Sequence, residues 1–550
     1  MVYSSPSPPV PVSLEPLHTK MLNAIESHIA ADPNAVAFVC AEDNNVRLTF
    51  REYREKAKNC AQFLSDRGFG HKNVLCQVLP NGLEYPVVLL GVLQCGGTMS
   101  GASAMFTDYE LERQFLDSRC TAVATDEAHL PKVMQAAERC PQIKTILCVR
   151  KGNKSLPKGV FAYDEAIRTK FRGLPPYKFS PDDVALLPYS SGTTGSPKGV
   201  MLSHKNFGTM VEVVQAHQNQ YISSFLSNNG NKFQWRGQPL CLMLPFYHIY
   251  GMGLLMNTVL EGLQGIVFKK FEPTIFLENI QKFKVQILFL VPPILLFLAK
   301  HPVAEKFDLS SLRVVISGAA PAGKDLCQEF TRKYPKARIA QAYGMTECGM
   351  ASHIADFKQS DDYTSVGIVL NNFEQKVVDV TTGAEVPLGQ RGEICVRSPT
   401  VMLGYLNRPE ATAETIDKDG WLHTGDIGYL GKDLRMNIVD RLKELIKVKG
   451  LQVPPAELED LLLSHPKIGD AAVIGIKDER CGEVPMAFVV RQDESLTIKD
   501  VLKFVEGKVS SYKWLAGGVE FLKEIPKAPS GKILRRFLRD EVARREKARL

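Results

Sequence analysis

The sequence has no pair of cysteines at C-x-x-C spacing and no histidine cluster at metal-ligand spacing, although it contains 12 cysteines and 11 histidines. This lack excludes the usual sequence patterns of a zinc-binding domain. We expect the scattered cysteines to be reduced and mostly buried. A secretory signal is also missing, because the first residues (MVYSSPSPPVPVSLEP) lack a basic segment followed by an apolar one. The sequence therefore predicts an intracellular protein with free thiols.

A long uninterrupted hydrophobic run is absent as well. Residues 240–260 carry no charge but contain Pro245 and His248. Residues 285–299 are too few to span a bilayer, and two consecutive prolines interrupt them. We expect both stretches in the core of a large α/β domain, and we predict no transmembrane segment.

The composition is that of a large globular protein. With 45% hydrophobic and 23% charged residues in 550, the chain has enough length for about three to four folding units. Its formal net charge is +7, and residues 441–550 hold 22 basic residues against 17 acidic ones. A solvated helix face or a phosphate-rich ligand accounts for this excess. No nucleic-acid partner is predicted, because no RNP-like segment, zinc spacing or long basic arm accompanies the charge.

Strand-like and helix-like segments alternate through most of the chain. In the N-terminal third this alternation predicts a largely parallel sheet covered by helices. A second cycle of apolar runs follows, and residues 373–397 then change to a hairpin pattern typical of a β-rich subdomain. The predicted class is α/β, with a large N-terminal domain of parallel-rich sheets and a small mobile α+β C-terminal domain. The predicted boundaries are a Pro/Ser-rich tail at 1–20, the large domain at 21–440, and the small C-terminal domain at 441–550.

The segment YSSGTTGSPKGV, residues 189–200, indicates specific chemistry. It follows the strand-like ALLPY and precedes MLSHKNFGTMVEVV, for which we predict a helix. Its Ser, Gly and Thr residues free backbone amides and hydroxyls to surround phosphate oxygens, and Lys198 adds a mobile cation. The segment is not a Walker A loop, because Pro197-Lys198-Gly199 replaces the Gly-Lys-Ser/Thr pattern. It predicts a phosphate-binding loop, with a flexible surface turn as the alternative.

This loop resembles the phosphate loop of the adenylate-forming superfamily, which includes fatty acyl-CoA synthetases, plant coumarate-CoA ligases and beetle luciferases. Seven further motifs of that superfamily follow in the same order, so the resemblance extends over essentially the whole chain after the N-terminal tail. The seven motifs are LPFYHIYGM (244–252), SGAAPAG (317–323), QAYGMTE (341–347), GYLNRPEAT (404–412), GWLHTGD (420–426), DRLKELIKVKG (440–450) and PKAPSGK (526–532).

The resemblance implies an ATP site that activates a carboxylic acid. Because the carboxylate attacks the α-phosphate of ATP, two anions must be brought together by cations and Mg²⁺. Lys198 and the loop before it are implied to hold the β- and γ-phosphates, Thr346 to lie near the α-phosphate, and Glu347 to bind Mg²⁺. The implied ATP-binding residues are Ser190, Ser191, Gly192, Thr193, Thr194, Gly195, Lys198, Gly318, Ala319, Ala320, Gln341, Tyr343, Gly344, Thr346, Asp426, Arg441 and Lys532.

The nucleoside end of ATP has its own implied contacts. By resemblance, Asp426 accepts from both ribose hydroxyls, and Arg441 reaches the same sugar from the other side of an interdomain hinge. Tyr343 is implied to stack on the adenine. The small residues at 318–320 let the backbone lie against the base and the acyl chain.

The acid and thiol ends involve three implied catalytic residues: His248, Thr346 and Lys532. His248 is implied to orient the substrate carboxylate as a neutral donor, with a satisfied core histidine as the alternative. Lys532 is implied to approach the acid and the α-phosphate and to withdraw when the C-terminal domain turns, with an ordinary exposed lysine as the alternative. The implied acyl pocket is Tyr250, Gly318, Met350 and Ala351, and the implied CoA-binding face is Lys447, Lys449 and Gly450, next to a hinge at Lys443.

The predicted function is an ATP-dependent acid-CoA ligase. Acid and ATP give an acyl-adenylate and pyrophosphate, and CoA then displaces AMP. An apolar pocket without a fixed cation predicts a medium- or long-chain fatty acid or an arylalkanoic acid. One alternative is a luciferase-like oxygenase acting on the adenylate, which Met350 disfavours because luciferases keep a polar residue there. The other is a non-catalytic nucleotide- or acyl-binding protein, which the presence of Lys532, Glu347 and Asp426 disfavours.

The last three residues, Ala548-Arg549-Leu550, are similar to the S-K-L peroxisomal address. A chance ending of a basic helix is the alternative. The tripeptide predicts a peroxisomal import receptor as a partner and the peroxisome as the location, with the cytoplasm as the other possibility.

Overall fold

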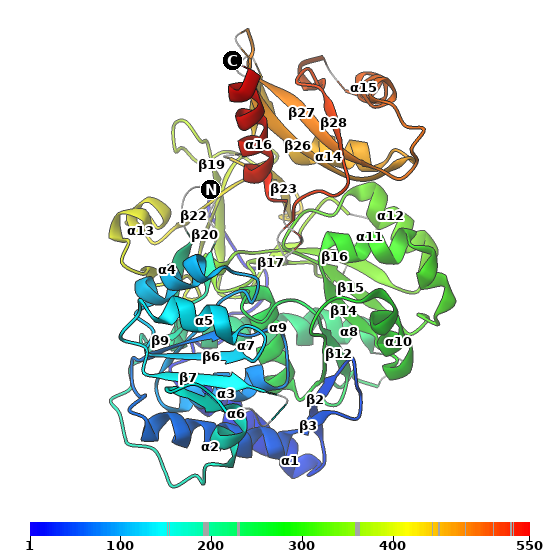
Figure 1. Ribbon diagram of the computed structural model, residues 1–550. Helices are drawn as coiled ribbons and strands as arrows, with labels where there is room; N and C mark the ends of the chain where they lie inside the picture. Colours follow the sequence, from blue (N-terminus) through cyan, green and yellow to red (C-terminus); the bar gives the residue numbers. More distant parts are fainter. Residues whose placement is uncertain are drawn as a thin grey trace.

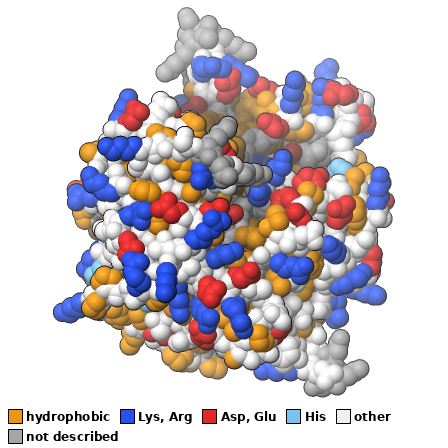
Figure 2. All heavy atoms as spheres, turned by 60° about the horizontal axis from the view of Figure 1, so that its bottom comes forward, with side chains coloured by type: hydrophobic (Ala, Val, Ile, Leu, Met, Phe, Trp, Pro, Cys, Tyr) orange, Lys and Arg blue, Asp and Glu red, His pale blue; other side chains and the backbone are white. Residues whose placement is uncertain are grey.

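The computed structural model consists of a large body and a smaller unit above it, which the C-terminal part of the chain forms (Figure 1). On the face shown in Figure 2, basic and acidic side chains are interspersed, as on a solvated surface. Within the described residues, no helix combines the length and the apolar character needed to cross a membrane. The structure describes residues 1–150, 152, 155–190, 197–227, 231–357, 363–442, 444–448, 451–478, 480–509, 511–527, 531 and 533–549, without the side chains of 441, 451, 452 and 546–549.

A nine-stranded sheet forms the base of the large domain. Its strand order is β10-β11-β9-β5-β4-β6-β7-β8, with β21 beside β11. The central strands β4 to β7 pair in parallel, and their apolar residues are buried on both faces, as expected when helices cover a parallel sheet. The strands are β4 (Val74–Val78), β5 (Thr98–Gly101), β6 (Ala122–Asp126), β7 (Thr145–Val149), β8 (Val160–Ala162), β9 (Val184–Leu186), β10 (Tyr189–Ser190), β11 (Lys198–Ser203) and β21 (Gly404–Tyr405).

Two smaller sheets complete the α/β part. In one of them β14, β15 and β16 run parallel, so their carboxyl ends meet at one edge, with Leu290 opposite Ser317 and Ser317 opposite Gln341. Ligand groups gather at such an edge in open α/β sheets. This edge carries the SGAAPAG and QAYGMTE motifs. The strands are β2 (Val36–Cys40), β3 (Arg47–Thr49), β12 (Pro239–Leu242) and β13 (Gln264–Val267) in one sheet, and β14 (Ile287–Leu290), β15 (Val314–Ser317), β16 (Arg338–Tyr343), β17 (His353–Ile354) and β18 (Ile368–Val369) in the other.

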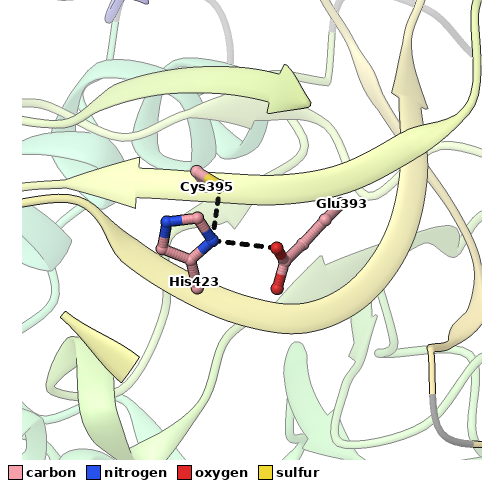
Figure 3. A group of neighbouring side chains, drawn as sticks. All are labelled: Glu393, Cys395 and His423. Atoms are coloured by element: carbon pink, nitrogen blue, oxygen red, sulfur yellow. Dashed lines mark hydrogen bonds and ion pairs between the residues drawn. The ribbon is translucent and has the colours of Figure 1, made fainter. Parts of the chain in front are cut away.

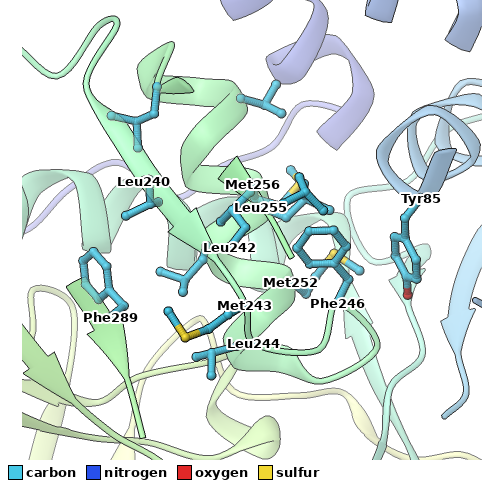
Figure 4. Close-up of a cluster of buried hydrophobic side chains, with 14 of the residues drawn as sticks. Tyr85, Leu240, Leu242, Met243, Leu244, Phe246, Met252, Leu255, Met256 and Phe289 are labelled. Carbon is cyan, nitrogen blue, oxygen red and sulfur yellow. The ribbon is translucent and has the colours of Figure 1, made fainter. Parts of the chain in front are cut away.

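The two uncharged apolar stretches lie in the core, as predicted. Residues 240–260 form β12 and then α9. Their apolar side chains, including Phe246 and Met252, belong to one buried cluster (Figure 4). Residues 285–299 form β14 and α11. The helices of the large domain are α1 (Leu17–Ala31), α2 (Phe50–Asp66), α3 (Glu84–Gln94), α4 (Asp108–Ser118), α5 (Leu130–Ala137), α6 (Tyr163–Arg168), α7 (His204–His217), α8 (Ser223–Leu226), α9 (Ile249–Glu261), α10 (Pro273–Phe283), α11 (Pro292–Lys300), α12 (Lys324–Lys333) and α13 (Pro409–Thr415), with a π-helical turn at Gln218–Ile222 and 3₁₀ turns at Pro302–Lys306 and Thr346–Cys348.

A five-stranded antiparallel sheet, in the order β1-β19-β20-β22-β23, forms the predicted β-rich subdomain. Its edge strand β1 comes from the segment predicted as a tail at 1–20, and the first helix already begins at Leu17. The structure differs here because Leu17, Met21 and Ile25 share one buried helix face, and the backbone N–H of Ser13 donates to Thr209. The strands are β1 (Tyr3–Ser4), β19 (Glu374–Val378), β20 (Gly392–Arg397), β22 (Leu422–Leu430) and β23 (Met436–Arg441).

The C-terminal unit is a second α+β fold with its own hydrophobic core. Strand β23, the last of the large domain, ends at Arg441, next to the predicted boundary at 440. Just before that end, Asp440 accepts a hydrogen bond from the backbone N–H of Ala456 at 3.0 Å, which ties the start of α14 to the boundary. The elements are β24 (Ile446–Val448), β25 (Leu451–Val453), α14 (Pro455–Leu463), β26 (Ile468–Asp478), β27 (Gly482–Arg491), α15 (Ile498–Glu506), a 3₁₀ turn (Ser511–Lys513), β28 (Val519–Leu522) and α16 (Arg535–Arg549).

All 12 cysteines are free thiols, as predicted. Cys40 and Cys481 are half-buried, and the other ten are buried.

Candidate active site

The phosphate loop connects two paired antiparallel strands. Ser190 on β10 lies opposite Lys198 on β11, and residues 191–196, which include the predicted Ser191 to Gly195, lie outside the described residues. The predicted helix directly after the loop is wrong over its first residues. Strand β11 continues to Ser203 because it pairs with β9 on one side and β21 on the other. Helix α7 begins only at His204, where the side chain of Ser203 caps it.

Strand β11 brings the loop cation close to the predicted Mg²⁺ ligand. Lys198 Nζ lies 4.8 Å from the centre of the Tyr405 ring, and the Tyr405 hydroxyl donates to Glu347 Oε1 at 2.8 Å. Tyr405 is positioned by the pairing of β21 with β11, in which it lies opposite Val200. Sequence analysis missed Tyr405, although it lies in the GYLNRPEAT motif. The structure therefore brings Lys198, Tyr405 and Glu347 into one cluster.

The surroundings of Glu347 fit a divalent cation. Glu347 is only 5% exposed. Within the described part of the chain, its side chain has one hydrogen-bond partner, the neutral phenol of Tyr405. No ion pair to Glu347 is found among the described residues. A buried carboxylate without a counter-charge is costly, so a cation beside it is favourable. Oxygen ligands of this kind are those that Mg²⁺ prefers.

The two predicted nucleoside contacts touch each other. The hydroxyl of Tyr343 donates to Asp426 Oδ2 at 2.6 Å. Burial and the neighbouring carboxylate raise the pKa of Tyr343 well above its usual value, so the phenol stays protonated. Asp426 on β22 lies opposite Arg441 on β23, which places Arg441 in the same sheet rather than across the hinge. The side chain of Arg441 lies outside the description.

The segment after β15 has the shape of a binding loop. Ala319 has a φ of +69°, a left-handed conformation that strains a residue with a side chain and is typical of functional sites. The predicted ATP ligand Gln341 uses its amide within the protein, accepting from the backbone N–H of Ala322 at 2.8 Å and donating to the carbonyl of Tyr363. Gln341 therefore positions this loop. Gly344 lies against Met350, whose carbonyl oxygen would be 2.0 Å from a Cβ at this position.

The predicted acyl-pocket residues lie around the start of α9. A Cβ on Gly318 would lie 3.2 Å from the ring of Tyr250, so the ring packs directly on the backbone after β15. The side chain of Met350 packs directly on the backbone of Gly253 in α9. The next residue, Ala351, is buried. The Tyr250 hydroxyl is buried and has no hydrogen-bond partner within the described residues. Among these four predicted residues, the Tyr250 hydroxyl is the one polar side-chain group.

His248 caps the N-terminus of α9. Its Nδ1 accepts from the backbone N–H of Tyr250 at 3.3 Å, so Nε2 is the ring nitrogen that carries a proton. Asn81 fixes the segment before it by accepting from the N–H of Phe246 and donating to the carbonyl of Leu244, both at 2.9 Å. Asn81 was missed, although a polar residue just after a parallel strand is a recognisable signal. A small cavity lined by Tyr85, Gly101, Tyr247 and Met252 adjoins this segment.

The C-terminal unit reaches the same edge of the large domain. A Cβ on Gly531 would lie 3.1 Å from Pro293 and 3.3 Å from Val291, the residues that follow β14. The residue before Lys532 is therefore placed at the strand ends that carry Gly318. Lys532 itself lies outside the described residues, as do Lys443, Lys449, Gly450 and Leu550. Lys447 is exposed on β24. Their predicted roles, and that of the C-terminal tripeptide, stay predictions.

Comparisons with known proteins cover nearly the whole chain. Residues 25–406 match the family described as AMP-binding enzyme, and residues 457–532 match the AMP-binding enzyme C-terminal domain. The 4-coumarate–CoA ligase 2 of Nicotiana tabacum is 43% identical over 508 residues, 91% of this chain and 90% of the relative. The 4-coumarate:CoA ligase 1 of Petunia hybrida is 42% identical over 506 residues, 91% of this chain and 90% of the relative.

Solved structures agree with the fold. ATP-bound MatB from Rhodopseudomonas palustris superposes with a TM-score of 0.82 at 26% identity, covering 94% of this chain and 98% of that one. The anthranilate CoA ligase AuaEII in complex with anthranoyl-AMP superposes with a TM-score of 0.84 over 97% of this chain and 98% of that one. At 23% identity, this second likeness concerns the fold alone.

Proposed function

Because this chain belongs to the AMP-binding enzyme family, it is an AMP-forming acid-thiol ligase that uses ATP, Mg²⁺ and CoA, and we propose that its acid substrate is an apolar, aryl-substituted monocarboxylic acid. The acid and ATP give an acyl-adenylate and pyrophosphate, and the CoA thiol then displaces AMP. The predicted family, the α/β class and the three cofactors are confirmed. The oxygenase alternative finds no support among the relatives named above.

The Tyr250 hydroxyl is the observation that carries the proposed substrate class. It is buried beside Gly318 without a partner, in surroundings that Met350 and Ala351 make apolar. Leaving such a hydroxyl unpaired costs about 1–3 kcal/mol, so a substrate that carries a hydrogen-bonding group to it gains this energy. A phenolic aryl acid has that group at the end of a flat apolar body. The relatives named as 4-coumarate–CoA ligases support this choice over a plain fatty acid.

Different residues of the site bind the acid, the ribose, the phosphates and Mg²⁺. His248 orients the acid as a neutral donor, while the Tyr343–Asp426 pair holds the ribose. Lys198 neutralises phosphate oxygens beside Tyr405, and Glu347 is the residue that would hold Mg²⁺. When bound, the ion supplies charge neutralisation on the phosphates. The role of Lys532 as the cation at the α-phosphate completes this proposal from the family resemblance.

A panel of acids tests the substrate class through AMP release with CoA present. The panel contains 4-hydroxycinnamate, its hydroxyl-free analogue cinnamate, a medium-chain and a long-chain fatty acid, acetate and a dicarboxylic acid. We expect the highest kcat/KM with the phenolic acid, exceeding that of cinnamate by about tenfold, and we expect Tyr250→Phe to remove that difference. A preference for either fatty acid would overturn the aryl proposal and leave the ligase activity standing.

We also propose the peroxisome as the location, on the similarity of Ala548-Arg549-Leu550 to the S-K-L address. Deleting these three residues from a protein tagged at its N-terminus should make it cytosolic. A full-length tagged protein that is already cytosolic would contradict the proposal.

A further inference from the structure

A group of three side chains in the β-rich subdomain has the chemistry of a metal site. We propose that Glu393, Cys395 and His423 bind a thiophilic divalent ion such as Zn²⁺, separately from the Mg²⁺ site at Glu347 (Figure 3). The ATP site and the acyl pocket described above do not include these three residues.

The sheet register brings the three residues together. Cys395 on β20 lies directly opposite His423 on β22, and Glu393 lies two residues before Cys395, so both β20 side chains point to the same face. The register shifts between these two pairs: Glu393 lies opposite Ile427, so two residues of β20 span four residues of β22. Strand β22 therefore has extra residues in a bulge, where Gly425 adopts a φ of +67°. Such bulges re-aim side chains next to functional sites.

The distances between the ligand atoms suit a tetrahedral ion. His423 Nδ1 lies 3.5 Å from Cys395 Sγ and 2.8 Å from Glu393 Oε2. Zinc bonds of about 2.3 Å to sulfur and about 2.0 Å to nitrogen place those two atoms about 3.5 Å apart in a tetrahedral site. The carboxylate oxygen needs to move away from Nδ1 by only about 0.5 Å to take its own position.

Neighbouring groups hold two of the three ligands in orientation. Glu393 Oε1 accepts from the backbone N–H of Gly425 at 3.0 Å, which leaves Oε2 for the ion. His423 Nε2 lies 3.6 Å from Asp417 Oδ2, so a carboxylate faces the ring nitrogen that does not bind the ion. Carboxylate–histidine pairs of this kind support metal-bound histidines in known sites.

The ligand set discriminates between the two ions. A thiolate and an imidazole favour Zn²⁺ and related transition metals, whereas Mg²⁺ prefers oxygen ligands alone. Binding forms bonds to Sγ, Nδ1 and Oε2, and it releases the thiol proton and the Nδ1 proton to the solvent, with no change of oxidation state. Cys395 is fully buried, but the side chains of Glu393 and His423 are 15% and 31% exposed, so the ion and a water ligand can enter from that side.

The site is also connected to the nucleotide pocket. Glu393 holds the N–H of Gly425, and the next residue is Asp426, which we place at the ribose. An ion that draws Glu393 toward itself shifts this segment, so we expect bound Zn²⁺ to raise the KM for ATP. This consequence rests on the proposed function, whereas the metal site does not.

Cobalt titration tests the site without any measurement of activity. Chelator-treated full-length enzyme in Mg²⁺ buffer is titrated with Co²⁺, and the thiolate-to-cobalt charge-transfer absorption is recorded. We expect saturation at one equivalent, loss of the band in Cys395→Ser, and at least tenfold weaker binding in His423→Gln and Glu393→Gln. Cys481→Ser is the matched control, since Cys481 is a half-buried thiol in the C-terminal unit.

Two outcomes would overturn the site. One is the absence of a stoichiometric band, and the other is a band that survives in Cys395→Ser. If Cys395→Ser does not fold, judged by its thermal unfolding, Glu393→Gln decides the question, because that change keeps the size of the side chain. Adding Zn²⁺ to the native enzyme and to Glu393→Gln then tests the connection to ATP. An equal KM for ATP with and without Zn²⁺ in the native enzyme would contradict that connection.

Discussion

The hydroxyl of Tyr343 donates to the carboxylate of Asp426 at 2.6 Å, which joins the residue predicted to stack on adenine to the residue predicted to hold the ribose. The two belong to the QAYGMTE and GWLHTGD motifs, 83 residues apart in the chain. Because burial and Asp426 both raise the pKa of Tyr343, the phenol keeps its proton and donates it permanently. Asp426 is therefore held in one orientation before the nucleotide arrives.

Replacing Tyr343 by Phe should weaken ATP binding and leave the adenine stacking surface intact. A hydrogen bond to a charged group contributes about 1.5–3 kcal/mol. Part of this energy keeps Asp426 oriented for the ribose, so we expect its loss to raise the KM for ATP about tenfold. Steady-state AMP formation at varied ATP concentration measures it. Tyr221→Phe is the control, because the Tyr221 hydroxyl contacts Ser7 in the N-terminal segment. Equal KM values for the native enzyme and Tyr343→Phe would show that the pair does not position the ribose ligand.

Glu347→Gln should reduce activity without reducing stability. The amide keeps the shape of the side chain and an acceptor for Tyr405, but it removes the buried charge that fits Mg²⁺. We expect adenylate formation to slow about 100-fold, equivalent to about 2.7 kcal/mol. In Mg²⁺-free buffer the variant should unfold at the same temperature as the native protein or a higher one, since an unpaired buried charge is gone. Pyrophosphate release and a thermal melt check the two halves of this prediction, and a marked fall in melting temperature would mean that Glu347 has a structural counter-charge.

Asn81→Ala should impair the use of the acid more than that of ATP. Asn81 makes two hydrogen bonds to the backbone just before His248, so its loss lets that segment shift. We expect about 1–3 kcal/mol lower stability and a lower kcat/KM for the acid, with the KM for ATP unchanged. Gln94→Ala also removes a buried amide with a backbone hydrogen bond, but on α3. If both variants lost stability and activity in parallel, Asn81 would have no specific positioning role.

Gly318→Ala should narrow the acyl pocket. The new methyl group would lie 3.2 Å from the Tyr250 ring, which is too close for an undisturbed contact. Overpacking of this kind costs about 1–3 kcal/mol, so the KM for an aryl acid should rise about tenfold, while that for a short unbranched acid changes less. Gly70→Ala serves as the control, because nothing lies within 4 Å of a Cβ at that position. An equal loss for aryl and short acids would place Gly318 outside the pocket.

The order of motifs was enough to predict the family and the α/β class. Gly318 lies in SGAAPAG and Met350 follows QAYGMTE, and these two segments meet because β15 and β16 run parallel and end at the same edge. Tyr250, from LPFYHIYGM, follows β12 in a different sheet and packs on Gly318. The helix predicted after the phosphate loop begins three residues later than expected, because Met201 to Ser203 carry no local signal that distinguishes a strand from a buried helix. These residues form a strand because they pair with β9 and β21.

Contacts that depend on strand register could not be predicted from the sequence. Tyr405 meets Glu347 because β21 pairs with β11, and no spacing in the chain reveals that pairing. Cys395 and His423 lie 28 residues apart, so a search for metal ligands by short spacing excludes them. The antiparallel register and the bulge at Gly425 bring them together.

Isotope transfer from the acid to AMP tests the central claim, the formation of an acyl-adenylate, most directly. The enzyme is given an acid whose two carboxylate oxygens are ¹⁸O, together with ATP, Mg²⁺ and CoA, and the masses of the nucleotide products are measured. If the carboxylate attacks the α-phosphate and CoA then displaces AMP, each AMP carries one ¹⁸O and pyrophosphate carries none. Formation of ADP and phosphate, or of AMP without the label, would contradict the account.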